Sequence, residues 1–212
     1  MTPTPAAATR TPATRAPAGQ AREKILDTAF RLFYAHGLRA AGIDTIIAES
    51  GVAKATFYKY FPAKDDLILA YLEKVDAVWT GQLKAAAEAA GPEPAAQLVG
   101  LFDALGTACR RDGYRGCAFI NAAAESAAGT RVHQRTVAHK QQILEWLETL
   151  ASQAGASEPA RLARSISLLL DGGLASGALD ADPAAAEAAR STAAQLVAAA
   201  TGTAPAALPE EP

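Results

Sequence analysis

The chain has 212 residues, of which 50% are hydrophobic and 20% charged, and its formal net charge is −2. This length suits one small and one larger domain, and the abundance of alanine favours closely packed helices over a sheet, so an all-α protein is expected. The negative net charge, taken alone, argues against a nucleic-acid-binding protein.

The charge is unevenly distributed along the chain. Residues 1–63 contain eight Arg or Lys residues and four Asp or Glu residues, a net charge of +4, so the remainder carries −6. A basic end and an acidic body suit a protein that contacts phosphate groups with one face only.

The sequence predicts neither export nor membrane insertion. No Leu, Ile, Val or Phe precedes Ile25, so no hydrophobic signal sequence is expected. No stretch approaches the roughly 18 consecutive apolar residues of a membrane span. The two cysteines, Cys109 and Cys117, are too few for a disulfide framework or a tetrahedral zinc site. A reduced, cytoplasmic protein is therefore expected.

The N-terminal region divides into a tail and a first helix. Residues 1–19 are rich in Thr, Pro and Ala, with Arg10 and Arg15 among them, and predict a disordered tail. A solvated tail is favoured over a basic arm that contacts DNA. Within residues 22–36 apolar side chains recur at helical spacing and stop at Gly37, which predicts a helix with a glycine C-cap.

Residues 40–61 have the pattern of a helix-turn-helix. Three isoleucines at positions i, i+3 and i+4 from Ile43 form one apolar face of a short helix. Gly51 tolerates the positive φ of a tight turn, and a second short helix is expected at residues 54–60. In this helix Phe57 points inward, while lysine, threonine and tyrosine side chains share the outer faces. Such a surface fits the phosphate oxygens and base edges of a DNA groove.

Ten residues in one register match the signature Gly-Val-Ser-Lys-Gly-Thr-(Leu/Phe)-Tyr-x-(Tyr/His)-Phe-x-x-Lys-x-x-Leu: they are Gly51, Val52, Lys54, Thr56, Phe57, Tyr58, Tyr60, Phe61, Lys64 and Leu67. On this match, residues 22–72 resemble the DNA-binding domain of the TetR family of bacterial transcriptional regulators. Four positions depart from the pattern. Ala53 and Ala55 replace a serine and a glycine, Ile47 replaces a small residue, and Gly42 stands where a capping Ser or Thr is common. Each missing cap costs about 1 kcal/mol of helix-end stability.

The resemblance implies a DNA-binding transcriptional regulator, and we expect a repressor that binds a palindromic operator in double-stranded DNA as a homodimer and is released by a small molecule. Phosphate contacts are expected mainly from Tyr58, Lys59 and Lys64, with Lys54, Thr56 and Tyr60 nearer the base edges. For Tyr60, inward packing is an equal alternative. The predicted DNA-contacting residues are Thr45, Lys54, Ala55, Thr56, Tyr58, Lys59, Tyr60 and Lys64.

Helical patterns cover most of the remaining chain and bring the expected total to about nine helices. A fourth helix begins after Pro62 and runs to about Leu83, and a single helix contains residues 98–105. Further helices are predicted at residues 117–128, 131–153, 158–177 and 183–200. The expected organisation is a disordered tail at 1–19, a DNA-binding domain at 20–66, a ligand-binding and dimerisation domain at 67–203 and a disordered tail at 204–212.

The last two helices, at about 158–177 and 183–200, are predicted to form a four-helix dimer interface. Small side chains on neighbouring helices permit close approach by a second pair, and in TetR-like proteins the last two helices usually form this interface. The alternative is that both helices simply complete the core of one protomer.

Polar residues inside the apolar second domain predict a pocket for a mostly apolar small molecule. Asn121 and Glu125 lie at i and i+4 of one helix and share a face with Cys117, and this stretch resembles one branch of the family. A structural hydrogen-bond network is an equal alternative. The predicted pocket residues are Phe102, Cys117, Phe119, Asn121, Glu125 and Trp146, which together would give an apolar cavity with a few orienting polar groups.

Enzymatic activity, a cofactor and a bound metal are not expected. No nucleophile–base pair or carboxylate pair stands out, and His133 and His139 are six residues apart, on opposite sides of a helix. Regulation by a protein partner, or by oxidation of Cys109 and Cys117, stays open as an alternative to a small molecule. For the cysteines, inert buried thiols are the simpler interpretation.

Overall fold

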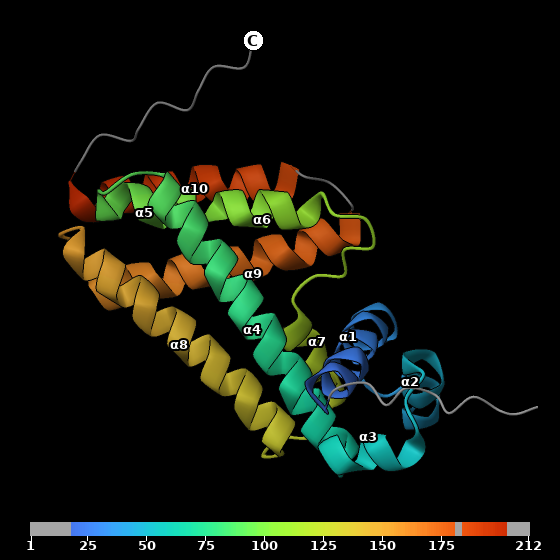
Figure 1. The fold of residues 1–212 in the computed structure, drawn as a ribbon. Coiled ribbons are helices and arrows are strands. Elements are labelled where there is room, and N and C mark those ends of the chain that lie inside the picture. Colours follow the sequence, from blue (N-terminus) through green and yellow to red (C-terminus); the bar gives the residue numbers. More distant parts are fainter. Residues whose placement is uncertain (1–17, 181–183, 203–212) are drawn as a thin grey trace, which may run out of the picture.

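The computed structural model describes residues 18–180 and 184–202, and over these residues the protein consists of ten α-helices (Figure 1). The all-α fold is therefore confirmed. The predicted tail at 204–212 lies outside the described residues, as does the tail at 1–19 except for its last two residues, which begin the first helix. None of the helices in the described ranges combines the length and apolar composition that a bilayer crossing requires.

Three helices form the N-terminal unit: α1 (Ala18–His36), α2 (Ile43–Ser50) and α3 (Lys54–Tyr60). Helix α1 ends as its sequence predicts, because Gly37 has a φ of +90° and its N–H donates to the carbonyl of Phe33 at 2.9 Å. Helices α2 and α3 both pack against α1, which places the helix-turn-helix on one side of the molecule (Figure 1).

Helix α4 (Lys64–Ala89) runs from the N-terminal unit into the larger body (Figure 1). It packs against α1 at one end and against the helices of the body along the rest of its length. The body contains α5 (Pro94–Gly100), α6 (Phe102–Cys109), α7 (Ala118–Glu125), α8 (Arg131–Gln153), α9 (Pro159–Asp180) and α10 (Ala184–Thr201). The most extensive packing joins α9 to α8 and to α10.

The single helix predicted around residues 98–105 is instead two helices, α5 and α6, which meet at Leu101. Gly100, the last residue of α5, allows α5 to approach α4 closely, because a Cβ atom there would lie 3.2 Å from the carbonyl oxygen of Ala86 on α4 and would clash with Ala90 just after α4. The N–H of Ala104 bonds to the carbonyl of Leu101 at 3.2 Å, a tighter turn than that of an α-helix. The close approach of α5 to α4 is a tertiary contact, which periodicity alone does not reveal.

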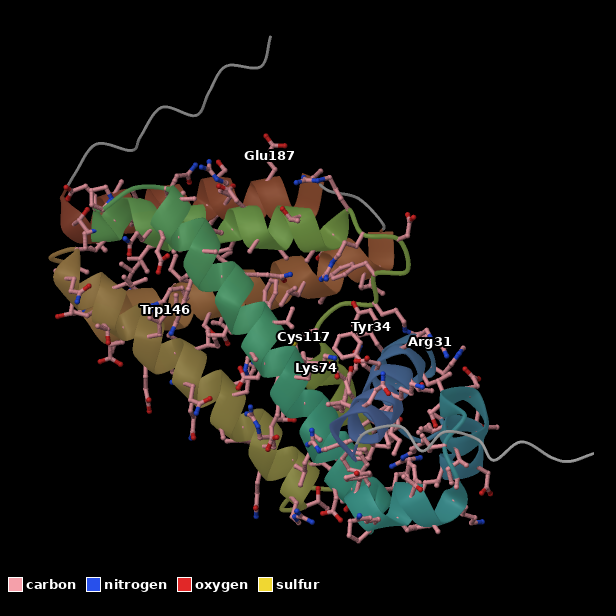
Figure 2. All side chains as sticks on the ribbon, in the orientation of Figure 1. Arg31, Tyr34, Lys74, Cys117, Trp146 and Glu187 are labelled. Atoms are coloured by element: carbon pink, nitrogen blue, oxygen red, sulfur yellow. The ribbon has the colours of Figure 1, made fainter. Side chains whose placement is uncertain are left out.

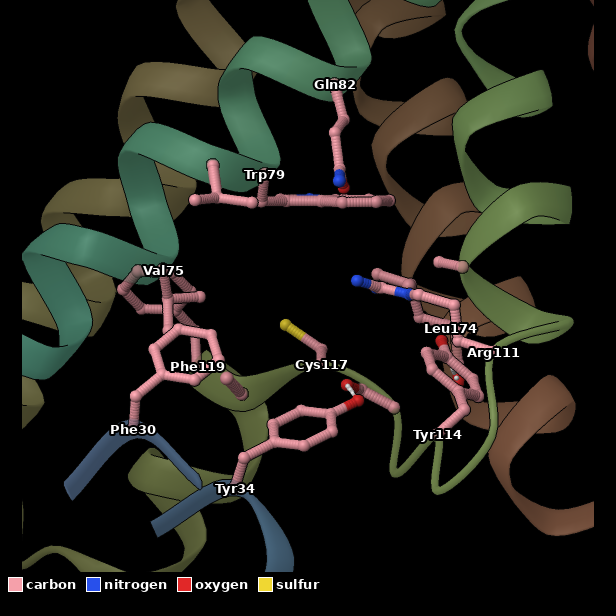
Figure 3. A pocket seen from close by; sticks show the side chains of 14 residues that line it. Phe30, Tyr34, Val75, Trp79, Gln82, Arg111, Tyr114, Cys117, Phe119 and Leu174 are labelled. Carbon is pink, nitrogen blue, oxygen red and sulfur yellow. Dashed lines mark hydrogen bonds between the residues drawn. The ribbon is translucent and has the colours of Figure 1, made fainter. Parts of the chain in front are cut away.

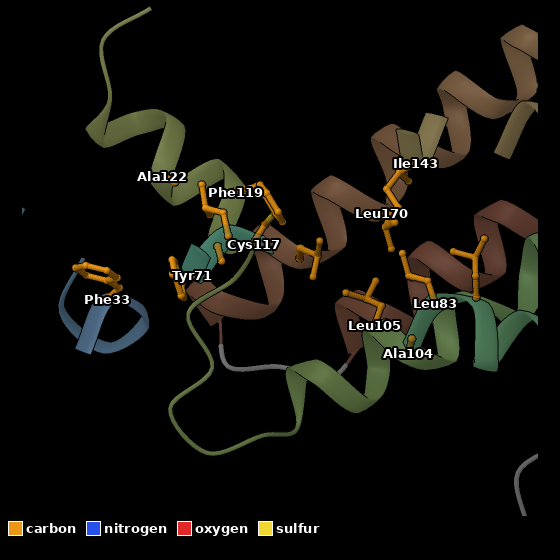
Figure 4. Packing of buried hydrophobic residues seen from close by; sticks show 14 of the residues in the cluster. Phe33, Tyr71, Leu83, Ala104, Leu105, Cys117, Phe119, Ala122, Ile143 and Leu170 are labelled. Atoms are coloured by element: carbon orange, nitrogen blue, oxygen red, sulfur yellow. The ribbon is translucent and has the colours of Figure 1, made fainter. Parts of the chain in front are cut away.

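One continuous hydrophobic core joins the N-terminal unit to the body (Figure 4). Tyr71 of α4 lies at the junction, 2% exposed, with edge-to-face contacts to Phe30 and Phe33 of α1 at 5.5 Å between ring centres. Aromatic pairs in this geometry contribute about 0.5–1.5 kcal/mol beyond their buried area. These ring contacts hold α4 against α1 at the junction.

Candidate DNA interface and ligand pocket

Helix α3 presents one polar face to solvent. Lys54, Ala55, Tyr58 and Lys59 are exposed, and their spacing of i, i+1, i+4 and i+5 places them on one side of the helix. Phe57 on the opposite side is fully buried and anchors α3 to the core. The exposed side therefore offers two cations, a phenol and a short alanine side chain at which a DNA groove can approach closely.

The turn between α2 and α3 depends on Gly51. Its φ is +67°, and its N–H donates to the carbonyl of Ile47 at 3.2 Å, a left-handed helix end that glycine adopts without steric cost. Neither Gly42 nor Ala53 caps the helix that follows it with a side-chain hydrogen bond. Helices α2 and α3 therefore both begin without a side-chain cap, as the sequence predicts.

The other residues predicted to contact DNA differ in their accessibility. Thr45 on α2 is exposed, whereas Thr56 and Tyr60 are half-buried, and Tyr60 packs against the core cluster. Lys64 is also half-buried: its Nζ lies 3.4 Å from the carbonyl oxygen of Arg39, and burial lowers its pKa below the ordinary value. Lys64 is therefore less available to phosphate than Lys54 or Lys59.

A cavity of about 100 Å³ lies where α1, α4, α7 and α9 meet the loop after α6 (Figure 3). We call it the junction pocket. Five of its fourteen lining residues are aromatic, and the Cys117 thiol points toward its centre (Figure 3). The lining residues are Phe30, Tyr34, Val75, Val78, Trp79, Gln82, Ala108, Arg111, Tyr114, Gly116, Cys117, Ala118, Phe119 and Leu174.

The junction pocket brings together only part of the predicted ligand set. Cys117 and Phe119 line it. Phe102 is 1% exposed in the core and is not among its lining residues, and Trp146 lies on α8, well away from Cys117 and Tyr34 (Figure 2). Helix α8 was correctly placed by periodicity, but the direction in which one of its side chains points is set by tertiary packing.

Glu125, at the end of α7, clasps the end of α1 instead of facing the junction pocket. Its carboxylate accepts hydrogen bonds from the backbone N–H of Leu38 at 3.0 Å and of Arg39 at 2.7 Å, and its carbonyl accepts one from Arg39 Nε at 3.1 Å. A Cβ atom on Gly37 would lie 2.6 Å from the carboxylate, so glycine is needed there for space as well as for its positive φ. We call these contacts the α7 clasp.

A second set of hydrogen bonds ties the loop before α7 to α1. The Tyr34 hydroxyl accepts the N–H of Arg115 at 3.0 Å and donates to the carbonyl of Gly116 at 3.3 Å. Asn121 donates through Nδ2 to the carbonyl of Arg115 at 2.9 Å. Asn121 and Glu125 thus make contacts of the kind that a structural network predicts, and both also line a separate cavity of about 220 Å³ beside α1, so ligand binding stays a prediction for them.

A partly buried polar cluster joins α4 to α8 beside Phe119 of the pocket wall. Asp76 pairs with Arg135, accepts the Thr80 hydroxyl at 2.9 Å and lies 2.7 Å from Nδ1 of His139. His139 is 1% exposed and stacks on Phe119 at 3.7 Å between ring centres. Burial lowers the pKa of His139. Burial alone would raise the pKa of Asp76, but the hydrogen bonds outweigh it and lower that pKa.

Sequence reasoning missed Tyr34, Trp79 and Arg111 as pocket residues. Only 6% of the chain is aromatic, so the scarcity of such side chains was a usable signal for Tyr34 and Trp79. Arg111 lies in the loop after α6, and only the fold brings that loop beside α4. The pKa of the half-buried Cys109 thiol is raised by burial, which disfavours the reactive thiolate.

Comparison with known proteins identifies the N-terminal unit. Residues 25–71 match the model of bacterial regulatory proteins of the tetR family. A segment of 52 residues is 46% identical to the uncharacterized HTH-type transcriptional regulator YxaF of Bacillus subtilis, covering 24% of this chain and 27% of that protein. The chain thus spans about a quarter of the length of the curated relatives that it matches.

Solved structures extend the similarity to the helical body. The crystal structure of SCO4454, a TetR-family transcriptional regulator from Streptomyces coelicolor, has a TM-score of 0.81 and 36% identity, covering 86% of this chain and 97% of that chain. A putative TetR regulator from Streptomyces avermitilis has a TM-score of 0.75 and 25% identity, covering 85% of this chain and 97% of that chain. Both are regulators and neither is described as an enzyme. This chain, 36% identical to SCO4454 over 86% of its length, belongs to the TetR family and is a helix-turn-helix DNA-binding transcriptional regulator.

Proposed function

We propose that this protein is a repressor that binds a palindromic operator as a homodimer and leaves DNA when a small, mostly apolar molecule occupies the junction pocket. In this proposal residues 20–66 are the DNA-binding domain and residues 67–203 the ligand-binding and dimerisation domain. The observation that carries it is the position of the pocket: its wall includes side chains of α1, α4 and α7, so a ligand there touches both domains at once.

The dimer part of the proposal is supported by an exposed stripe on α9. Leu168 and Leu179 are 65% and 84% exposed, and Gly172 and Ala175, also exposed, lie between them at helical spacing. Large exposed leucines in register with small residues suit a surface that a second helix pair covers. The neighbouring α10 adds small or polar exposed residues: Ala188, Thr192, Gln195 and Ala199.

The DNA part of the proposal assigns the exposed face of α3 to the major groove. Lys54 and Lys59 contact phosphates or base edges, and Ala55 and Tyr58 approach the groove between them. One seven-residue helix reads too few base pairs to select an operator. A dimer that places two such helices about 34 Å apart would read two half-sites in successive major grooves.

Release follows from two connections between the junction pocket and α1, one through α7 and one through α4. A ligand that packs against Phe119 and Cys117 presses on α7, whose clasp holds the end of α1 through Leu38 and Arg39. The same ligand touches Trp79 on α4, which packs on α1 through Tyr71. If the ligand binds better to a conformation in which the two recognition helices are wrongly spaced, it shifts the population away from DNA.

Selection of bound sequences from a random DNA pool tests the first half of the proposal. We expect enrichment of one palindromic sequence. Titration of small molecules against the labelled sequence, followed by fluorescence polarisation and thermal shift, then tests release. Compounds that raise the Tm should also weaken DNA binding. Enrichment of a single non-repeated half-site would contradict the dimer, and compounds that raise the Tm without changing DNA affinity would contradict release.

A further inference from the structure

The walls of the junction pocket favour a flat ring. Trp79 lies on one side, Phe30 and Phe119 on a second, and Tyr34 and Tyr114 complete the enclosure (Figure 3). Aromatic walls of this kind attract planar aromatic ligands, because rings stack or meet edge to face at short separation. The volume of about 100 Å³ corresponds to roughly seven to ten water-sized sites at about 10–15 Å³ each, which is the size of a single-ring molecule with a short substituent.

The charge of the pocket is carried by one residue. Arg111 is the only charged side chain among the fourteen that line it, and Figure 3 shows its guanidinium directed into the space below Trp79. Within the described ranges this guanidinium has no hydrogen bond or ion pair to a protein group, whereas the other arginine beside the site, Arg115, bonds to the carbonyl of Ala35. Arg111 is exposed, so its charge is in contact with solvent, and the walls of the pocket leave this positive charge unneutralised.

The two tyrosine hydroxyl groups of the pocket already form hydrogen bonds within the protein. Tyr114 donates to the carbonyl of Leu174 at 3.0 Å, and Tyr34 bonds to the loop at Arg115 and Gly116. The groups left for a ligand are the Arg111 guanidinium, the Gln82 amide and the Cys117 thiol. A carboxylate satisfies a guanidinium with two parallel hydrogen bonds, which a neutral hydroxyl or amide does not.

We propose that the junction pocket binds a small aromatic carboxylate, with its ring between Trp79 and Phe119 and its carboxylate on Arg111. This inference rests on the proposed function, because it names the class of ligand for the same pocket. Arg111 sets the preference for an anion, and the aromatic walls set the preference for a planar ring.

Matched acids and amides test the inference directly. The chain has two tryptophans, so the Trp146→Phe variant leaves Trp79 as the sole reporter of the pocket. Benzoate and cinnamate are titrated into this protein without DNA, in parallel with benzamide and cinnamamide. We expect saturable quenching of Trp79 emission, with the acids binding roughly tenfold or more tightly than the amides, since hydrogen bonds to charged groups are about twice as strong as neutral ones.

Two variants locate the source of the preference. Arg111→Gln should abolish the difference between acid and amide, whereas Arg110→Gln, which removes the same charge from the adjacent exposed position outside the pocket lining, should keep it. Circular dichroism confirms that each variant is folded. Equal binding of acids and amides, retention of the preference in Arg111→Gln, or no quenching by any probe would overturn the inference.

Release from DNA is measured separately, so that the two proposals fail in different ways. Acids that bind at Trp79 but leave operator affinity unchanged support the ligand class and contradict ligand-induced release. If neutral compounds release the operator and benzoate and cinnamate do not bind, ligand-induced release is supported and the assignment of an aromatic carboxylate is overturned.

Discussion

Among single residues, Lys54 and Lys59 on α3 are more accessible to a DNA phosphate than Lys64 at the start of α4. Lys54 has a mostly exposed partner, Asp44, at 3.4 Å, an ion pair of the kind that contributes roughly 0–1 kcal/mol. Lys64, by contrast, is held against the carbonyl of Arg39. Lys54 and Lys59 are therefore the cations on the helix-turn-helix that exchange most readily from water to phosphate.

Replacing Lys54 and Lys59 by alanine should weaken operator binding and its salt dependence together. Each phosphate contact that is lost reduces the slope of log K against log salt by about 0.9. Fluorescence polarisation between low and physiological salt measures both quantities. As a control, Lys84→Ala removes an exposed lysine from α4 and should leave the slope unchanged. If the slope is also unchanged in the Lys54 and Lys59 variant, these lysines do not contact DNA phosphates.

His139 gives the body of the protein a dependence on pH. Its pKa is lowered from the ordinary value of 6.5 because it is buried, and the charges of Lys140 and Arg135 act in the same direction, while Asp76 opposes them. As the pH falls through 6.5 the unfolded chain takes up the proton first. The free energy of unfolding therefore decreases from about pH 6.5 downward, until the folded protein is protonated too.

The His139→Asn variant should flatten this dependence. Asparagine keeps an N–H donor where Nδ1 faces Asp76 but does not titrate, so urea midpoints measured from pH 5 to pH 7.5 should vary less than in the parent. His133→Asn, at a partly exposed position near the start of α8, should retain the parental slope. Identical slopes for the parent and His139→Asn would show that another group is responsible.

Among the secondary-structure elements, α7 is a short helix that contacts both the junction pocket and the segment after α1. It has eight residues, so its position depends on what it packs against more than on its own helical stability. On one side Phe119 lines the pocket and stacks on His139. At its end Glu125 forms the α7 clasp, so that a small shift of α7 reaches α1 directly.

Glu125→Ala should destabilise the protein and weaken ligand-induced release of DNA. The buried amide of Leu38 would lose its acceptor, which costs about 1–3 kcal/mol, and a loss of this size lowers the Tm by roughly 2–4 °C per kcal/mol. Thermal denaturation and operator release are measured on the same variant. Glu145→Ala, exposed on α8, is the matched control, and parental release by Glu125→Ala would exclude the clasp as the coupling element.

At the scale of the whole molecule, the proposed dimer gives the recognition helices their spacing. The N-terminal unit and the body share one core, so two bodies that associate through α9 and α10 fix the separation of two copies of α3. The two exposed leucines on α9, Leu168 and Leu179, each gain about 1.5–3 kcal/mol on full burial.

Leu168→Glu should convert the dimer into a monomer and lower operator affinity by at least about tenfold, because a carboxylate in an apolar interface is costly to desolvate. Sedimentation equilibrium at micromolar concentration measures the association state. Val137→Glu places the same charge at a residue on α8 that is 41% exposed and should remain dimeric. A parent protein that sediments as a monomer would refute the dimer itself.

The elements whose signals are local can be predicted from the sequence. The apolar face of α2, the turn at Gly51 and the inward Phe57 are encoded within about twenty residues. Helical periodicity predicts both ends of α8 and, with the glycine cap, the end of α1, but α1 begins at Ala18, inside the predicted tail. These features are set by backbone sterics and by the burial of one helix face, so neighbouring residues specify them without knowledge of the fold.

The place of the junction pocket and the hydrogen-bond partners of the polar residues near it follow from tertiary packing. Tyr34 and Gly116 are 82 residues apart, and Leu38 and Glu125 are 87 residues apart. Helical periodicity shows that a face is buried but not which helix covers it, since apolar burial is non-directional and depends on area. The sequence thus predicts Cys117 and Phe119 as pocket residues, but only tertiary packing places them beside Trp79 and Arg111. Packing also places the Glu125 carboxylate on the backbone N–H groups that follow α1.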